Sequence, residues 1–274
     1  MRLQCGEAGN KTPLNPLFQL GNRGLVATAL LLTIVGGFVD AVGYIALFEI
    51  FTANMSGNSI HIGMYLSQRD WPNLLRPLCA VASYVVGMLL TRIALEISAR
   101  AGITRVASYT LTVEALLLAV FARAKPAMHL GQVADVHTPG YFLLIAMLAF
   151  AMGVQTATLT HVGGMNVYTT FVTGTLTKIT ESLTRALFWV HDELCKTGMS
   201  DVVRQATGQK DVREATMLIS TWTAYVLGAA LGAASKARWQ LRALYVPVAV
   251  LAGFVLIDRF RPISSEEEKH QTGA

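Results

Sequence analysis

The sequence predicts an all-α integral membrane protein, a helical bundle of six to eight membrane segments built from two related halves. Of its 274 residues, 53% are hydrophobic and only 14% are charged, whereas soluble domains carry about 25% charged residues. Apolar blocks recur from Leu25 to Ile257 with no polar stretch of domain size between them. A surface so poor in charge suits lipid, so we expect the lipid bilayer to surround this chain.

Eight apolar runs are candidates when judged against the roughly 20 residues that cross a bilayer. They are 25–48, 51–66, 78–97, 107–122, 141–160, 167–187, 217–234 and 243–257. The second run is short and rich in amides and hydroxyls, and the sixth carries threonines with Lys178 and Glu181. Segments of this kind are buried against other helices, line a cavity or re-enter without crossing. The sequence therefore allows eight spans, or six spans with two re-entrant segments.

Polar stretches flank and divide the apolar runs. They are an N-terminal tail at 1–24, a linker at 124–140, an insert at 191–214 and a C-terminal tail at 259–274. In both topologies most Lys and Arg residues fall on the side of the two termini, which predicts cytoplasmic termini and a cytoplasmic insert. The basic residues are scattered singly, which argues against nucleic acid as a partner, and the three cysteines form no metal or redox motif. We expect no metal, no cofactor and no catalytic residue.

The two halves, 25–123 and 141–258, share three short motifs in the same order. Each half has a long apolar helix with a polar residue near its end, then a hydroxyl-glycine box, then a Tyr-Val-X-Gly motif. This alignment pairs Asp40 with Gln155, Ser56 with Thr173, Asn58 with Thr175, His61 with Lys178, and Gly57 with Gly174. Four spans per half would relate the halves by an axis along the membrane normal, and three spans plus a re-entrant segment would invert them.

Three motifs resemble the YoaK family of bacterial membrane proteins, which carries a domain of unknown function. They are Gly-Phe-Val-Asp-Ala-Val-Gly at 37–43, Ala-Asn-Met-Ser-Gly-Asn at 53–58 and Val-Thr-Gly-Thr-Leu-Thr at 172–177. The family usually has Thr where this chain has Ser56, a change that keeps the hydroxyl. The resemblance implies about six spans and a bacterial inner-membrane location, and it implies no activity.

Two acidic residues lie inside apolar runs. An ionised carboxylate near mid-bilayer costs at least roughly 2.5–3.5 kcal/mol, so such residues are usually functional or paired. Asp40 shares a helix face with glycines, Thr33 and Tyr44 and is expected to face protein, within reach of the Ser56-Gly57-Asn58 box or its counterpart. Asp40 and Glu114 are the candidates for proton coupling. The alternatives are a structural tie to the box for Asp40, and an ion pair with Arg92 or a buried neutral carboxyl for Glu114.

The two boxes are the candidate substrate pathway, because matching interruptions in two halves mark the site in secondary transporters. The pathway residues are Asn54, Ser56, Gly57, Asn58, His61, Gln155, Thr173, Gly174 and Thr175. The alternative is hydrogen bonding between helices, which one box would explain well and two matching boxes less well.

The function that this pattern favours is a small secondary transporter or permease for an unknown small solute, with proton coupling. A second hypothesis is a membrane scaffold or regulator without transport, docking through the insert. An intramembrane enzyme is the third, and it fits poorly because Ser56 and His61 point in different directions on one helix.

Overall fold

The protein is described by a computed structural model, which covers residues 22–101, 106–123, 137–158, 161–162, 165–166, 172–195, 202, 205–206 and 208–260. The helices are α1 (Asn22–Ala46), α2 (Met55–Gln68), α3 (Trp71–Arg100), α4 (Val106–Arg123), α5 (Pro139–Thr158), α6 (Val172–Leu194), α8 (Lys210–Trp239) and α9 (Tyr245–Phe260), with the 3-10 helix η3 (Gln240–Leu244) before α9. Strands β1 (His161–Val162) and β2 (Met165–Asn166) form a minimal antiparallel pair.

The predicted helical membrane fold is confirmed. Four stretches are long and apolar enough to cross a membrane, namely Val26–Ala46, Trp71–Ser98, Pro139–Thr158 and Lys210–Ile257, and the last contains both α8 and α9. Two helices extend into the stretch expected to be the insert: α6 continues to Leu194 and α8 begins at Lys210. The tails at 1–24 and 259–274 and the linker at 124–140 lie largely outside the described residues, as do residues 196–201, 203–204 and 207 of the insert at 191–214.

Local sequence signals explain where the helices begin and end. Arg69 takes the left-handed conformation with φ 57°, and its N–H bonds to carbonyls in the last turn of α2. Asp70 Oδ1 then accepts from Asn73 N at 3.3 Å, so this carboxylate caps the start of α3. These two consecutive residues make the tight turn between α2 and α3.

Helices α1 and α8 run in the same direction and are in close contact. Gly228 meets the backbone of Ile34, and Gly232 meets the backbone of Phe38, so the contacts advance together along both helices. Gly37 of α1 lies against the α8 backbone in return. The missing Cβ atoms let the two backbones approach, as is common for membrane helices.

Helices α3 and α5 form a second parallel pair with similar contacts. Arg76 near the start of α3 bonds to Tyr141 near the start of α5. Further along, Gly87 meets the backbone of Phe150, and Gly153 meets the α3 backbone. Both helices therefore run in one direction, with glycines at their crossing.

Helices α1 and α5 run in opposite directions. The Tyr141 hydroxyl donates to Leu47 O at 2.7 Å just after the end of α1, and Gln155 near the end of α5 donates to Leu32 O in the middle of α1. Consequently α1 and α8 point one way, whereas α3 and α5 point the other.

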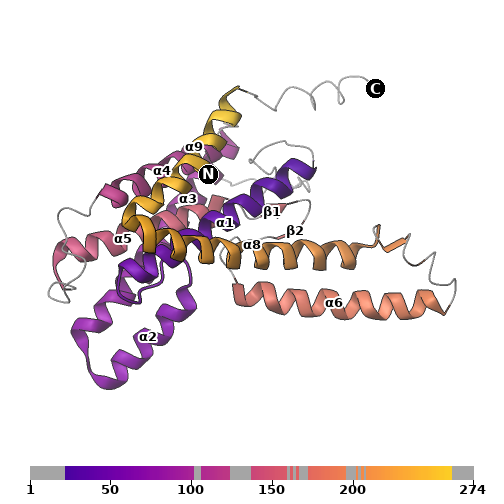
Figure 1. Ribbon diagram of the computed structural model, residues 1–274, viewed down its shortest axis with the longest axis horizontal. Coiled ribbons are helices and arrows are strands. Elements are labelled where there is room, and N and C mark those ends of the chain that lie inside the picture. The colour runs from indigo at the N-terminus through magenta and orange to yellow at the C-terminus, as the bar shows by residue number, and fades with distance from the viewer. Residues whose placement is uncertain are drawn as a thin grey trace, which may run out of the picture.

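These directions show that neither α2 nor α6 crosses the bundle. The chain leaves α1 and enters the oppositely directed α3 at the same end, so the segment containing α2 returns to the side from which it started. The same holds for α6, between α5 and α8. Figure 1 shows α2 projecting from one end of the bundle, and α6 running beside the N-terminal part of α8 at the other end. The six-span scheme, with two returning segments, is the one that this architecture fits.

Candidate functional site

Asp40 lies in the interior of the bundle with 4% of its surface exposed. Its Oδ1 accepts from Thr52 N at 2.7 Å, Ala53 N at 2.7 Å and Thr52 Oγ1 at 3.1 Å. Its Oδ2 accepts from the Tyr225 hydroxyl at 2.6 Å. One carboxylate thus joins α1, the loop before α2 and α8.

All four of these hydrogen bonds are donated to Asp40, which is the arrangement that suits an ionised carboxylate. The N–H groups of Thr52 and Ala53 have no helix or strand partner, because they lie in the irregular segment before α2. Buried backbone donors require acceptors, and Asp40 supplies one. The expected tie to the Ser56-Gly57-Asn58 box is therefore corrected: the donors are Thr52 and Ala53, which lie before the box in the irregular segment.

Tyr225 was not among the residues predicted for the site. Its hydroxyl reaches Asp40 from a position 185 residues later in the chain. The available signal was the motif at 225–228, which recurs at 84–87. A motif on one helix does not show which residue on another helix its tyrosine hydroxyl contacts.

A second Tyr pair has the same arrangement between α3 and α5. The Tyr84 hydroxyl donates to Thr156 Oγ1 at 3.0 Å, and Thr156 in turn donates to Met152 O at 2.8 Å. A Cβ on Gly153 would collide with backbone atoms of Tyr84 and Met88, just as one on Gly37 would collide with those of Tyr225 and Ala229. These contacts make Thr156 the structural counterpart of Asp40 in the second half. The sequence alignment pairs Asp40 with Gln155, which is one residue earlier.

Gln155 itself points toward α1. Its Nε2 donates to the Leu32 carbonyl, and the side chain is fully buried. Its Oε1 has no hydrogen-bond partner among the described residues. Gln155 therefore links the two parallel pairs of helices and keeps one free buried acceptor.

Asn58 fastens the unwound segment to α2. Its Nδ2 donates to Phe51 O at 2.7 Å and its Oδ1 accepts from Phe51 N at 3.1 Å. The Phe51 ring covers Gly57, where an added Cβ would lie 2.6 Å from a ring carbon. This fully buried amide holds the backbone of the loop that reaches Asp40.

The other residues of the first box turn away from Asp40. Ser56 is exposed and donates to Asn54 Oδ1 at 2.7 Å. His61 is half-buried between the rings of Phe51 and Tyr65, at centroid distances of 6.5 and 6.2 Å. Its Nδ1 is buried and has no hydrogen-bond partner within the described part of the chain.

The second box forms the first turn of α6. Thr173 is exposed, Gly174 is half-buried and Thr175 is buried. Further along α6, Arg185 bonds to Asp211 at 2.6 Å and lies 3.6 Å from Glu214, both on α8. The hydrogen bond with Asp211 raises the pKa of the Arg185 guanidinium, so this link between α6 and α8 is ionic.

Glu114 lies in the middle of α4, away from the Asp40 cluster. The side chain is fully buried, and neither carboxyl oxygen has a hydrogen-bond partner among the residues that the structure describes. The suggested ion pair with Arg92 does not form, because Arg92 is exposed on α3 and makes no ion pair with Glu114. Of the two predicted acids, Asp40 accepts four hydrogen bonds, whereas Glu114 accepts none from the described residues.

Arg76 is a buried residue that sequence reasoning missed. Its Nη2 donates to Phe48 O at 2.6 Å and to Tyr141 Oη at 3.0 Å, and its guanidinium carbon lies 5.5 Å from the Tyr141 ring centre. The carbonyls at the end of α1 carry the negative end of the helix dipole, which favours a cation there. Arg76 and Tyr141 thereby fix the point from which the chain turns back toward Asp40.

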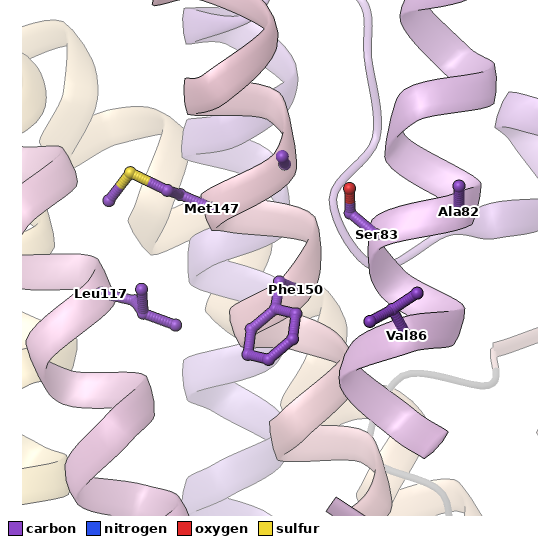
Figure 2. A pocket seen from close by; sticks show the side chains of 7 residues that line it. Ala82, Ser83, Val86, Leu117, Met147 and Phe150 are labelled. Carbon is purple, nitrogen blue, oxygen red and sulfur yellow. The ribbon is translucent and has the colours of Figure 1, made fainter. Parts of the chain in front are cut away.

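A groove of about 350 Å³ lies between α3, α4 and α5. Figure 2 shows Val86 and Ser83 of α3, Leu117 of α4, and Met147 and Phe150 of α5 around it. Its lining is apolar except for Ser83, and none of the predicted pathway residues contributes to it. The groove is therefore a separate feature from the polar cluster at Asp40.

Comparison with known proteins gives one family and one relative. The family described as "Protein of unknown function (DUF1275)" matches residues 28–257. The chain is 25% identical over 236 residues to UPF0700 transmembrane protein YoaK of Bacillus subtilis (strain 168), which covers 84% of this chain and 92% of that protein. No solved structure is detectably similar.

Proposed function

Because the chain belongs to the DUF1275 family of proteins of unknown function, we propose from the site itself that it is a small secondary transporter or permease, coupled to protons. The observation that carries this proposal is the place of Asp40. A carboxylate inside the bundle is bonded both to an unwound segment of its own half and to Tyr225 of the other half. Unwound segments that meet an opposite half in the interior are the usual construction of transporter sites.

The proposal includes an internal repeat with inverted halves. In its support, the Gly37 and Gly153 contacts match, as do the hydrogen bonds of Tyr225 and Tyr84. Each parallel pair takes one helix from each half, so the halves are interlocked. Alternating access would then tilt one pair against the other about the two glycine crossings.

The proposed solute pathway does not include every residue of the two boxes. Asp40 and Gln155 are buried and Tyr225 is half-buried at the junction of the halves. By contrast, Ser56 and Thr173 are exposed and Asn58 holds the loop. We assign the unknown small solute to the junction and the exposed box residues to its approach. The proposal also places the chain in the inner membrane, with cytoplasmic termini and a cytoplasmic insert. Poor labelling of a cysteine at position 200 by a reagent added outside the cell would support this orientation.

A non-catalytic role is likewise proposed. The Ser56 hydroxyl donates to Asn54 and not to a histidine, and His61 is enclosed by aromatic rings. The second candidate is a scaffold or regulator, and the saturation of Asp40 by four donors favours it, since a purely structural carboxylate would be bonded in this way.

Flux measured in liposomes distinguishes the two functions. Purified protein is reconstituted with a pH-sensitive dye inside, and a panel of small solutes is added outside. Proton movement that depends on one solute, and on the protein, supports transport. A folded, correctly inserted protein that moves no proton with any solute, and no radiolabelled solute either, would favour the scaffold.

A further inference from the structure

Glu114 differs from every other described acidic residue in having neither solvent nor a donor. The side chain is fully buried, and Oε1 and Oε2 both lack partners among the described residues. An isolated ionised carboxylate in an apolar interior is so unfavourable that such a group takes up a proton instead. Asp40, by contrast, is surrounded by four donors that stabilise its charge.

The elements packed against α4 supply no compensating charge. They are α5, α9, η3 and α3. The titratable or charged residues in the parts of these elements that the structure describes are Tyr141 of α5, Tyr245, Asp258 and Arg259 of α9, Arg242 of η3, and Arg76, Cys79, Tyr84, Arg92, Glu96 and Arg100 of α3.

None of the groups whose side chains the structure describes is a hydrogen-bond partner of Glu114. Tyr141 bonds to Leu47 and Arg76, and Tyr84 bonds to Thr156. Tyr245, Arg242, Arg92, Glu96 and Arg100 are exposed, and the Cys79 thiol contacts Phe142 O. Asp258 and Arg259 occupy the last turn of α9. On α4 itself, Tyr109 and Arg123 are exposed.

We propose that Glu114 is the proton-binding group of this protein, neutral in the arrangement described above, and that Asp40 serves as the hydrogen-bond acceptor that joins the two halves. The assignment of this proton to coupling rests on the proposed transport function. The neutral state of Glu114 does not.

The proton transfer is simple in its chemistry. The neutral acid releases H⁺ from its hydroxyl to a water molecule and becomes a carboxylate. That carboxylate needs donors, and no group that the structure describes donates to Glu114 in this arrangement, so release requires water to reach α4. Proton exchange is thereby tied to an opening of the bundle, which is what coupling demands.

Infrared spectroscopy of the full protein in lipid nanodiscs tests the protonation directly. A protonated buried carboxyl has a C=O stretching band separate from that of carboxylates. We expect this band at neutral pH in the wild type and in Asp40→Asn, and its loss in Glu114→Gln. Glu96→Gln is the matched control, because Glu96 is exposed and paired with Arg100 at 2.8 Å.

Each outcome decides the proposal. A band that survives Glu114→Gln but disappears in Asp40→Asn would assign the proton to Asp40, and a wild type without the band would show Glu114 ionised; either overturns the inference. Thermal unfolding of Glu114→Gln near that of the wild type establishes that loss of the band is not loss of the fold. If it unfolds early, Glu114→Asp is used, and the band should return with a shifted frequency.

Flux separates this inference from the proposed function. Solute-driven proton flux in the wild type but not in Glu114→Gln supports the coupling role, whereas full flux in Glu114→Gln removes it. A clear Glu114 band with no flux for any solute would contradict transport and leave the neutral acid in place.

Discussion

The hydroxyl of Tyr225 on α8 donates to Oδ2 of Asp40 on α1 at 2.6 Å, across 185 residues of sequence. This contact connects the second half of the chain to Asp40, whose carboxylate also accepts the hydrogen bonds of the loop before α2. Helices α1 and α8 already touch through Gly228 and Gly232, so the tyrosine is held in place by packing. The hydrogen bond is consequently short, and its carboxylate side is buried.

Tyr225→Phe should destabilise the protein by about 1–3 kcal/mol, because it removes a donor from a buried charged acceptor. Thermal unfolding in detergent measures the loss. Tyr109→Phe is the control, since Tyr109 is 67% exposed, and it should be nearly neutral. In a double-mutant cycle with Asp40→Asn, additive effects would show that the two side chains do not interact.

Gly37→Ala and Gly153→Ala should each destabilise by about 1–3 kcal/mol, because the added methyl group would meet backbone atoms that cannot rotate away. Gly63→Ala on α2 is matched to them, because nothing lies within 4 Å of its would-be Cβ. That control should be neutral or stabilising by up to about 1 kcal/mol, since alanine favours helix. Equal effects in all three variants would contradict the close helix crossings.

The sequence was sufficient for the helices and for the inward orientation of Asp40. Its neighbours on the α1 face are small or hydroxyl-bearing, which is the pattern of a protein-facing surface in a membrane helix. The strength of that signal comes from periodicity along one helix. It needs no knowledge of what lies opposite.

The donors to Asp40 were beyond such reasoning. Thr52 and Ala53 act through backbone N–H groups, which every residue type except proline has, so no side-chain pattern marks them. The sequence also could not show that Ser56 and Thr173 are exposed, since a hydroxyl beside a glycine gives the same pattern whether it lines a cavity or faces outward. Arg76 was missed because a basic residue before an apolar run usually lies at the membrane surface.

Cysteines introduced at Glu49 and Ser67 should both be labelled from the same side of the membrane by an impermeant maleimide. Both positions are exposed; Glu49 precedes α2 and Ser67 lies in its last turn. The chain there returns to the end of α1 at which it started. The three native cysteines are first replaced by serine.

Arg100→Cys, at the far end of α3, is the control for sidedness. Because α3 leads away from the α2 end of the bundle, this position should be labelled only from the other side. Labelling of Glu49→Cys and Ser67→Cys from opposite sides would mean that α2 crosses the membrane.

The two substitutions of Asp40 itself distinguish its charge from its hydrogen bonds. Asparagine keeps an oxygen that accepts from Thr52 and Ala53 and offers an amide to the Tyr225 oxygen. Leucine fills similar space but leaves two backbone N–H groups buried without acceptors, which costs about 1–3 kcal/mol for each. We therefore expect Asp40→Leu to unfold at a clearly lower temperature than Asp40→Asn.

Flux then shows whether the charge matters beyond the fold. If Asp40 is a fixed carboxylate at the solute junction, folded Asp40→Asn should bind or move solute poorly while the Glu114 infrared band stays unchanged. Full solute-driven proton flux in a stable Asp40→Asn protein would reduce Asp40 to an anchor for the loop. Equal unfolding temperatures for the asparagine and leucine variants would contradict the anchor as well, because the loss of two acceptors cannot be silent in a dry interior.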